Sequence, residues 1–351
     1  MKTIPVSFPL KTASALLLAL CAAPVLAQSS VTLYGVMDLG VVRESGGPAG
    51  SLTKLTSGMA GGSRLGFRGT EDLGGGLSAF FTLESGLFAD TGAFGQGGLA
   101  FGRQSFVGLK GGFGAVSLGR QYTPAAMVQV EMDPFVTGLA GTSANLLSPG
   151  GAGGNNRMDN AIKYNTPGNL NGFNAEAVYG FGEVANNSAA SRQYGANVGY
   201  AQGPLSVKAA YHNVNNAAGV GSSVTWLAGK YDFGVLTGYA NYVINKGSAV
   251  FGVVNPDSRD TLLGVSVPLG SGKLMASYIR KRDQTSAGDN ASQFAVGYDH
   301  FLSKRTDVYV SYAHINNSKA IVAGSSGYRV GNSTEQGSGN QGISVGIRHS
   351  F

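Results

Sequence analysis

Cysteine, histidine and tryptophan are scarce in this chain of 351 residues, which contains one, four and one of them. The single cysteine, Cys21, lies in an apolar stretch near the N-terminus, so the chain that follows can form no disulfide and offers no thiol nucleophile. The histidines are far apart and lack the spacing of metal ligands: His212, His300, His314 and His349. We therefore expect no metal site and no cofactor.

Long apolar runs are missing after the N-terminus. No later stretch reaches about 18 apolar residues, which excludes a transmembrane helix. The N-terminal run TASALLLALCAAPVLA follows a basic start, Lys2 and Lys11, and ends on the small-residue pattern Val25-Leu26-Ala27. This arrangement is typical of a secretory signal, so residues 1–27 are predicted to be a signal peptide and residues 28–351 the mature protein.

The charge is modest. Of the 25 basic residues, Lys2 and Lys11 lie in the predicted signal, which leaves 23 against 19 acidic residues and a net charge of +4. A nucleic-acid-binding protein usually has a much larger basic excess, so no nucleic-acid partner is expected.

Glycine, in contrast, is abundant, with 56 copies. It disfavours helices by roughly 1 kcal/mol per interior site but is tolerated in strands interrupted by turns. Many segments alternate strictly between apolar and polar residues, as a strand with one apolar and one wet face does. The clearest are 31–42, 77–88, 172–181, 235–244 and 292–301, whereas 273–283 is less regular. The chain is therefore predicted to be all-β.

The connections between these segments are of two alternating kinds. Seven are short and glycine-rich, at 71–77, 110–114, 165–173, 201–205, 231–235, 268–273 and 301–306. Eight are long and polar, near 44–62, 89–99, 121–158, 183–191, 214–222, 246–258, 284–291 and 317–340. Together they join 16 strands, an even number with short turns at one end and long loops at the other. This pattern predicts a 16-stranded antiparallel transmembrane β-barrel that is wide enough for a water-filled channel.

The chain resembles the general porins of Gram-negative outer membranes, most closely the beta-proteobacterial type. The resemblance runs from the signal to the last residue. It is carried by SSVTLYGVMDLG, SRLGFRGTEDLGGGLSAFFTLESG, FGRQSFVGLKGGFGAVSLGRQY and RMDNAIKYNTP. It implies an outer-membrane homotrimer, in contact with lipid and lipopolysaccharide, whose third long loop folds into each lumen. It also implies that the terminal Phe351 is a signal for the β-barrel assembly machinery.

The resemblance further implies a constriction in which wall arginines face acids of the third loop. Arg64, Arg103 and Arg157 match the family's arginine positions. Alternation places Arg64, Arg68 and Arg157 on the wet face. Alternation is ambiguous for Arg103, because Val107 and Leu109 share its face.

The acids expected in the constriction come from two sources. Glu131 and Asp133 are the acids of the third loop, in QVEMDPF, and Glu84 and Asp38 face the lumen by alternation. In the alternating pattern Arg120 falls on the same face as Val116 and Leu118. It is therefore predicted to face away from the lumen, where it could take part in a trimer contact.

These features predict a porin for passive diffusion of ions and small hydrophilic solutes, with a preference for anions and no enzymatic activity. A second hypothesis is a substrate-selective channel, for example for phosphate or organic anions, which a saturable conductance would reveal. A barrel enzyme and an adhesin are weaker hypotheses. An enzyme would need a nucleophile, a histidine and a carboxylate together, and no histidine lies in a matching motif.

Overall fold

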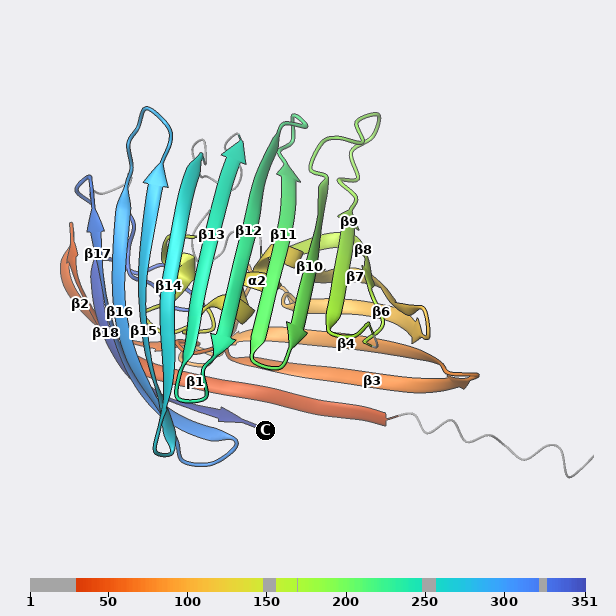
Figure 1. Cartoon of the computed structure of the whole chain (residues 1–351), viewed down its shortest axis with the longest axis horizontal. Coiled ribbons are helices and arrows are strands. Elements are labelled where there is room, and N and C mark those ends of the chain that lie inside the picture. The colour runs from red at the N-terminus through yellow and green to blue at the C-terminus, as the bar shows by residue number, and fades with distance from the viewer. Residues whose placement is uncertain (1–29, 148–155, 169, 248–256, 322–326) are drawn as a thin grey trace, which may run out of the picture.

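A computed structural model describes residues 30–147, 156–168, 170–247, 257–321 and 327–351. The predicted signal peptide, residues 1–27, lies outside the described residues. The described residues form one antiparallel β-sheet that curves round on itself (Figure 1).

Closure of the sheet is achieved by its first and last strands, β1 (Ser30–Gly47) and β18 (Gln341–Ser350). Their pairing runs from Val36 opposite Ser350 to Ser45 opposite Gln341. The strands between them are β2 (Gly50–Ser57), β3 (Arg64–Gly74), β4 (Leu77–Phe88), β5 (Ala93–Phe94), β6 (Gln104–Gly111), β7 (Gly114–Tyr122), β8 (Arg157–Asn165), β9 (Phe173–Gly180), β10 (Gln193–Gln202), β11 (Leu205–Asn215), β12 (Gly221–Asp232), β13 (Thr237–Gly247), β14 (Ser258–Leu269), β15 (Gly272–Asp283), β16 (Ala291–Phe301) and β17 (Thr306–Asn317).

These strands occupy 16 positions around the barrel. Strands β2 and β3 share one position, because both pair with β1, β2 along its second half and β3 along its first. Strand β5 is a two-residue piece that pairs only with the end of β4. The predicted 16-stranded antiparallel barrel is therefore confirmed.

The two faces of the strands differ as the alternation predicts. Along β1, Val31 and Leu33 are exposed, whereas Asp38 and Glu44 on the other face are buried. The outer surface of the barrel is thus apolar and the polar residues point inward. Within the described residues every strand except β2 and β5 pairs with a neighbour on both sides, so the backbone groups of these strands are satisfied within the sheet.

The seven short turns lie where the sequence predicts them. The first long connection, in contrast, is not the loop that the sequence predicts. Residues 44–62 were expected to form a loop, yet β1 continues to Gly47 and β2 starts at Gly50. The inward side chains of this hairpin are charged, and Lys54 pairs with Glu44 at 3.1 Å. Polar residues on both faces make such a strand look like a loop in sequence. Apart from the turn at residues 48–49, only residues 58–63 leave the sheet.

The third long connection begins after β7 with helix α2 (Pro124–Met132). Its first turn is set by Pro124 at the helix start and by the Thr123 side chain, which accepts a hydrogen bond from the Ala126 N–H. A short 3₁₀ turn, η1 (Ser143–Asn145), follows. No helix within the described parts of the chain is long and apolar enough to cross a membrane.

This connection packs against strands on the face opposite to the exposed apolar one. Asn241 of β13 donates to the Met132 carbonyl at 2.9 Å, and Gln293 of β16 donates to the Gly141 carbonyl at 3.1 Å. Both strand residues are buried, while their neighbours Tyr242 and Phe294 are exposed. Figure 1 shows α2 behind strands β10 to β13.

Apolar side chains fill the space between the connection and the strands. From the connection come Val128, Met132, Phe135, Leu146 and Leu147, and from the strands Trp226, Val243, Leu262, Ile279 and Ile315. Burial of each large side chain stabilises this arrangement by about 1.5–3 kcal/mol.

Candidate functional site

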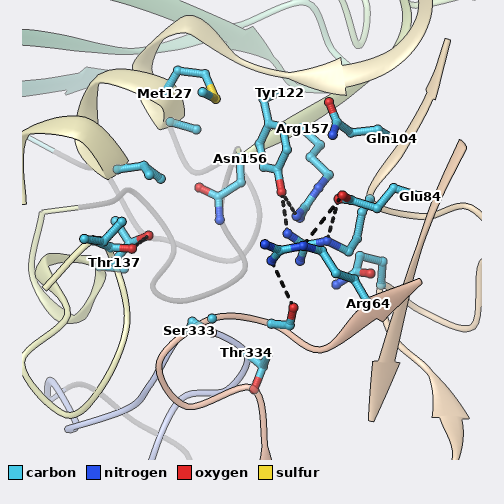
Figure 2. A pocket seen from close by; sticks show the side chains of 18 of the residues that line it. Arg64, Glu84, Gln104, Tyr122, Met127, Thr137, Asn156, Arg157, Ser333 and Thr334 are labelled. Carbon is cyan, nitrogen blue, oxygen red and sulfur yellow. Dashed lines mark hydrogen bonds and ion pairs between the residues drawn. The ribbon is translucent and has the colours of Figure 1, made fainter. Parts of the chain in front are cut away.

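A cavity of about 1150 Å³ lies between the start of the third connection and strands β1, β3, β4, β6, β7, β8 and β18. Six arginines line it: Arg64, Arg68, Arg103, Arg120, Arg157 and Arg348. Two acids line it, Glu84 and Asp159. Figure 2 shows several of the arginines converging near Glu84 and Tyr122.

Glu84, in the middle of β4, partly neutralises two of these arginines. Its carboxylate accepts a hydrogen bond from Arg103 Nε at 2.8 Å and lies 3.7 Å from Arg64 Nε. The Tyr34 hydroxyl donates to its second oxygen at 2.9 Å. One carboxylate therefore serves two guanidinium groups and a phenol.

Tyr122, at the end of β7, joins two guanidinium groups. Its hydroxyl oxygen accepts from Arg103 at 2.7 Å and from Arg157 at 2.6 Å. The Arg157 guanidinium also lies over the Tyr122 ring, 4.4 Å from its centroid. Within the described residues no carboxylate pairs with Arg157, and its buried Nε atom has no hydrogen-bond partner. A neutral acceptor fixes Arg157 without cancelling its charge.

Arg103 reaches the cavity because it precedes β6 rather than belonging to it. Val107 and Leu109, which share its alternation, are exposed on the outer surface. The alternation of β6 does not extend to Arg103, whose backbone N–H donates to the Glu84 carbonyl across the strand end.

Arg120 also lines the cavity, so the prediction that it faces away from the lumen was wrong. The β7–β8 register shifts between Gly119 and Gln121, which interrupts the alternation set by Leu118. Gly119 has φ +130°, a conformation that glycine adopts readily. Arg120 then donates to the Gly102 carbonyl at 2.8 Å and pairs with Asp159.

The two loop acids lie elsewhere and do not face the arginines. Glu131 pairs with Lys208 of β11 and, at 3.8 Å, with Lys230 of β12. Asp133 is buried inside the loop, where its carboxylate accepts hydrogen bonds from backbone N–H groups of the residues that follow: Phe135, Thr137 and Ser143. Burial raises the pKa of the Asp133 carboxyl. Neither acid lines the cavity.

Asp38 faces inward, as its alternation predicts, but is fully buried rather than on the cavity wall. Its carboxylate accepts the N–H groups of Ala60 and Gly61 at 2.8 and 2.7 Å, and the Tyr309 hydroxyl donates to it. Asp38 therefore holds the segment 58–63 in place.

Arg348 and Tyr122 also line the cavity but were not assigned to it from the sequence. Arg348 of β18 pairs with Asp307 at 3.0 Å and lines the cavity. The alternation of the last strand places Arg348 on the wet face, but no sequence motif assigns it to the constriction. Nothing in the sequence indicated that Tyr122 bridges two arginines, because that contact depends on the path of the third connection.

A model of the family described as Gram-negative porin matches residues 13–320. The chain belongs to the Gram-negative porin family. Outer membrane porin protein 32 of Delftia acidovorans is 37% identical over 342 residues, which cover 93% of this chain and 95% of that protein. An outer membrane porin of Bordetella pertussis is 29% identical over 402 residues, which cover 96% and 98%.

A solved structure, described as the anion-selective porin from Comamonas acidovorans, is 34% identical with a TM-score of 0.78. It covers 92% of this chain and 100% of that one. The resemblance to the beta-proteobacterial porins is therefore confirmed. This porin is an outer-membrane β-barrel, so its exposed apolar face meets lipid.

Proposed function

We propose that this porin is an anion-preferring channel for passive diffusion of ions and small hydrophilic solutes. The single observation that carries the proposal is the excess of six arginines over two acids on one cavity. We assign Arg64, Arg68, Arg103 and Arg157 to the constriction, with Glu84 as its internal counter-charge, and add Arg120 and Arg348. The solved relative from Comamonas acidovorans, described as anion-selective, supports the same preference.

An upper bound on the bias follows from the net charge of +4 on the residues that line the cavity, because Arg348 also pairs with Asp299 and Asp307, which do not line it. Four unit charges about 10 Å away in water contribute about 1.7 kcal/mol, and a Debye length of about 10 Å lowers this to about 0.6 kcal/mol. Monovalent anions would be enriched and cations depleted about threefold each, a ratio of about eightfold. Such a bias discriminates without holding an ion tightly, which suits conduction.

We further propose that residues 123–147 lie inside the barrel and narrow the channel. Their hydrogen bonds to inward side chains of β13, β15 and β16 support this. Glu131 and Asp133 then determine the shape of the constriction. Glu131 binds α2 to the wall, and Asp133 stabilises the fold of the loop. Asp38 acts in the same way on the segment 58–63.

The partners are also part of the proposal. We infer a homotrimer in contact with outer-membrane lipid and lipopolysaccharide, a cleaved signal at 1–27, and Phe351 as the signal for the assembly machinery. The membership in the porin family supports each of these inferences.

Enzymatic and adhesive functions are not favoured, and we propose that the porin breaks no bond. The relatives found by comparison are porins. All four histidines are described, and no ion pair joins any of them to a carboxylate within those parts of the chain. A substrate-selective channel would differ from a diffusion channel in showing a conductance that saturates with the concentration of its solute.

The test is the reversal potential of the purified porin in a planar bilayer under a KCl gradient near 0.1 M. Arg64 and Arg157 are both changed to alanine, and Arg280→Ala serves as control because Arg280 lies exposed on the outer face of β15. The anion-to-cation ratio is expected to fall from about eightfold to about threefold in the double variant and to stay unchanged in the control. A double variant with unchanged selectivity would remove the arginine cluster as the filter.

A further inference from the structure

The side of the cavity formed by the third connection carries apolar side chains where acids were expected. Met127, Val130 and Val136 line it, with Met127 39% and Val136 50% exposed. No acid of this connection lines the cavity within its described part, and residues 148–155 contain no acid in the sequence. The cationic wall therefore faces a surface without acids, which is apolar at Met127, Val130 and Val136 and polar at Gln129 and Thr137.

The backbone of the connection is strained where it presents this surface. Val136 and Thr137 have φ of 54° and 56°, a left-handed conformation that is unfavourable for β-branched residues. The Asp133 carboxylate holds the strained turn by accepting the Thr137 N–H at 3.1 Å. Strain of this kind persists where the surroundings enforce it and is concentrated at functional sites.

The apolar and cationic sides are opposed across the open space. Figure 2 shows Thr137 and Met127 on one side of the cavity, and Arg64, Arg157 and Glu84 on the other. Among the described residues Arg157 forms an ion pair with no carboxylate, and the Tyr122 hydroxyl that holds it leaves its positive charge uncancelled. A bound anion would find a charged donor there and an apolar surface opposite.

We propose that the constriction favours monocarboxylates with an apolar body over hydrophilic anions of similar size. The carboxylate interacts with Arg157 and its neighbours while the hydrocarbon part contacts Met127 and Val136. This inference rests on the proposed anion channel and names its solute class. Removing one methylene from water at the apolar surface would favour passage about fourfold.

The test compares hexanoate with gluconate, two six-carbon monocarboxylates that differ in their hydroxyl groups. Reversal potentials with chloride on one side and either anion on the other give the permeability ratio of hexanoate to gluconate. The variant Met127→Gln/Val136→Asn removes the two exposed apolar side chains of this surface, and asparagine tolerates the left-handed conformation at 136. The control is Val220→Asn, an exposed valine outside the cavity.

We expect the hexanoate-to-gluconate ratio to fall about fourfold or more in the double variant and to remain unchanged in the control. The chloride selectivity of the double variant should stay that of the wild type, because no charge is altered. Equal ratios in wild type and double variant would overturn the inference and leave the anion channel standing. If the wild-type porin showed no preference for anions over cations, the proposed function would be overturned instead.

Discussion

The charge of an arginine in this cavity depends on which acceptor holds it. Arg103 is bound by the Glu84 carboxylate at 2.8 Å, whereas Arg157 is bound by the Tyr122 hydroxyl. A hydrogen bond to a charged group contributes about 1.5–3 kcal/mol, so either acceptor can fix a side chain. Only the carboxylate cancels the field, and the tyrosine leaves the full charge facing the cavity.

Glu84→Gln should therefore strengthen the anion preference. Removing one negative charge raises the net charge of the cavity from +4 to +5, and the anion-to-cation ratio is expected to rise to about thirteenfold. The measurement is the reversal potential under a KCl gradient. Glu71→Gln, which changes an exposed acid of β3 outside the cavity, is the control. A lower ratio in Glu84→Gln would mean that Glu84 positions Arg103 more than it neutralises it.

Among the elements, α2 is tied to the wall by ion pairs as well as by apolar packing. Glu131 pairs with Lys208 and Lys230, whose side chains are 15% and 30% exposed. Pairs with this degree of exposure contribute about 0.2–1 kcal/mol each. The helix is thus held by modest interactions that add to its buried residues.

Glu131→Gln should loosen α2 without unfolding the barrel. Amide hydrogens of α2 are expected to exchange about twofold to thirtyfold faster, because loss of both ion pairs makes opening of the helix easier by about 0.4–2 kcal/mol. Hydrogen exchange of the detergent-solubilised porin measures this, with the strands as internal reference. Faster exchange in α2 of Glu71→Gln as well would show that the effect is not specific to the ion pairs.

The elements of the barrel were largely predictable from the sequence, because a strand between lipid and water alternates by necessity. Residues 77–88 were predicted and observed as one strand, and the irregular 273–283 also forms a strand. The first hairpin was not recognised, since Glu44 and Lys54 make its inner face polar and Arg43 and Thr53 make its outer face polar.

The site was predictable only where motif or alternation applied. Arg64 and Arg157 could be placed on the wet face in this way. Arg120 could not, because a shift of register is invisible in the sequence. The positions and partners of Glu131 and Asp133 depend on the three-dimensional path of the loop, which no local sequence pattern encodes.

At the scale of the whole molecule, the last residue takes part in closing the barrel. The Phe351 N–H donates to the Gly35 carbonyl and the Gly35 N–H to the Phe351 carbonyl, both at 3.1 Å. These bonds use the backbone, so the aromatic ring is not required for them. Phe351 as a whole is 44% exposed, which is compatible with the recognition role proposed for its ring.

Phe351→Ala should separate these two roles. We expect the variant to refold in detergent with the thermal stability of the wild type, but to accumulate less in the outer membrane of cells. The control is Ile347→Ala, which removes an apolar side chain of similar exposure from the same face of β18. Equal losses of membrane accumulation in both variants would refute a specific role of the terminal ring.

In addition to apolar packing, side chains of the wall bind the main chain of the third connection. Lys230, Asn241, Lys281 and Gln293 donate to the carbonyl oxygens of Glu131, Met132, Leu146 and Gly141. A carbonyl oxygen is present whatever side chain the residue bears. The exposed side chains of the loop, such as Met127 and Val136, can therefore drift during evolution while the path of the loop persists. Single substitutions at these positions could therefore change which solutes pass through such a porin. The same positions are suited to engineering solute uptake while the barrel is left unchanged.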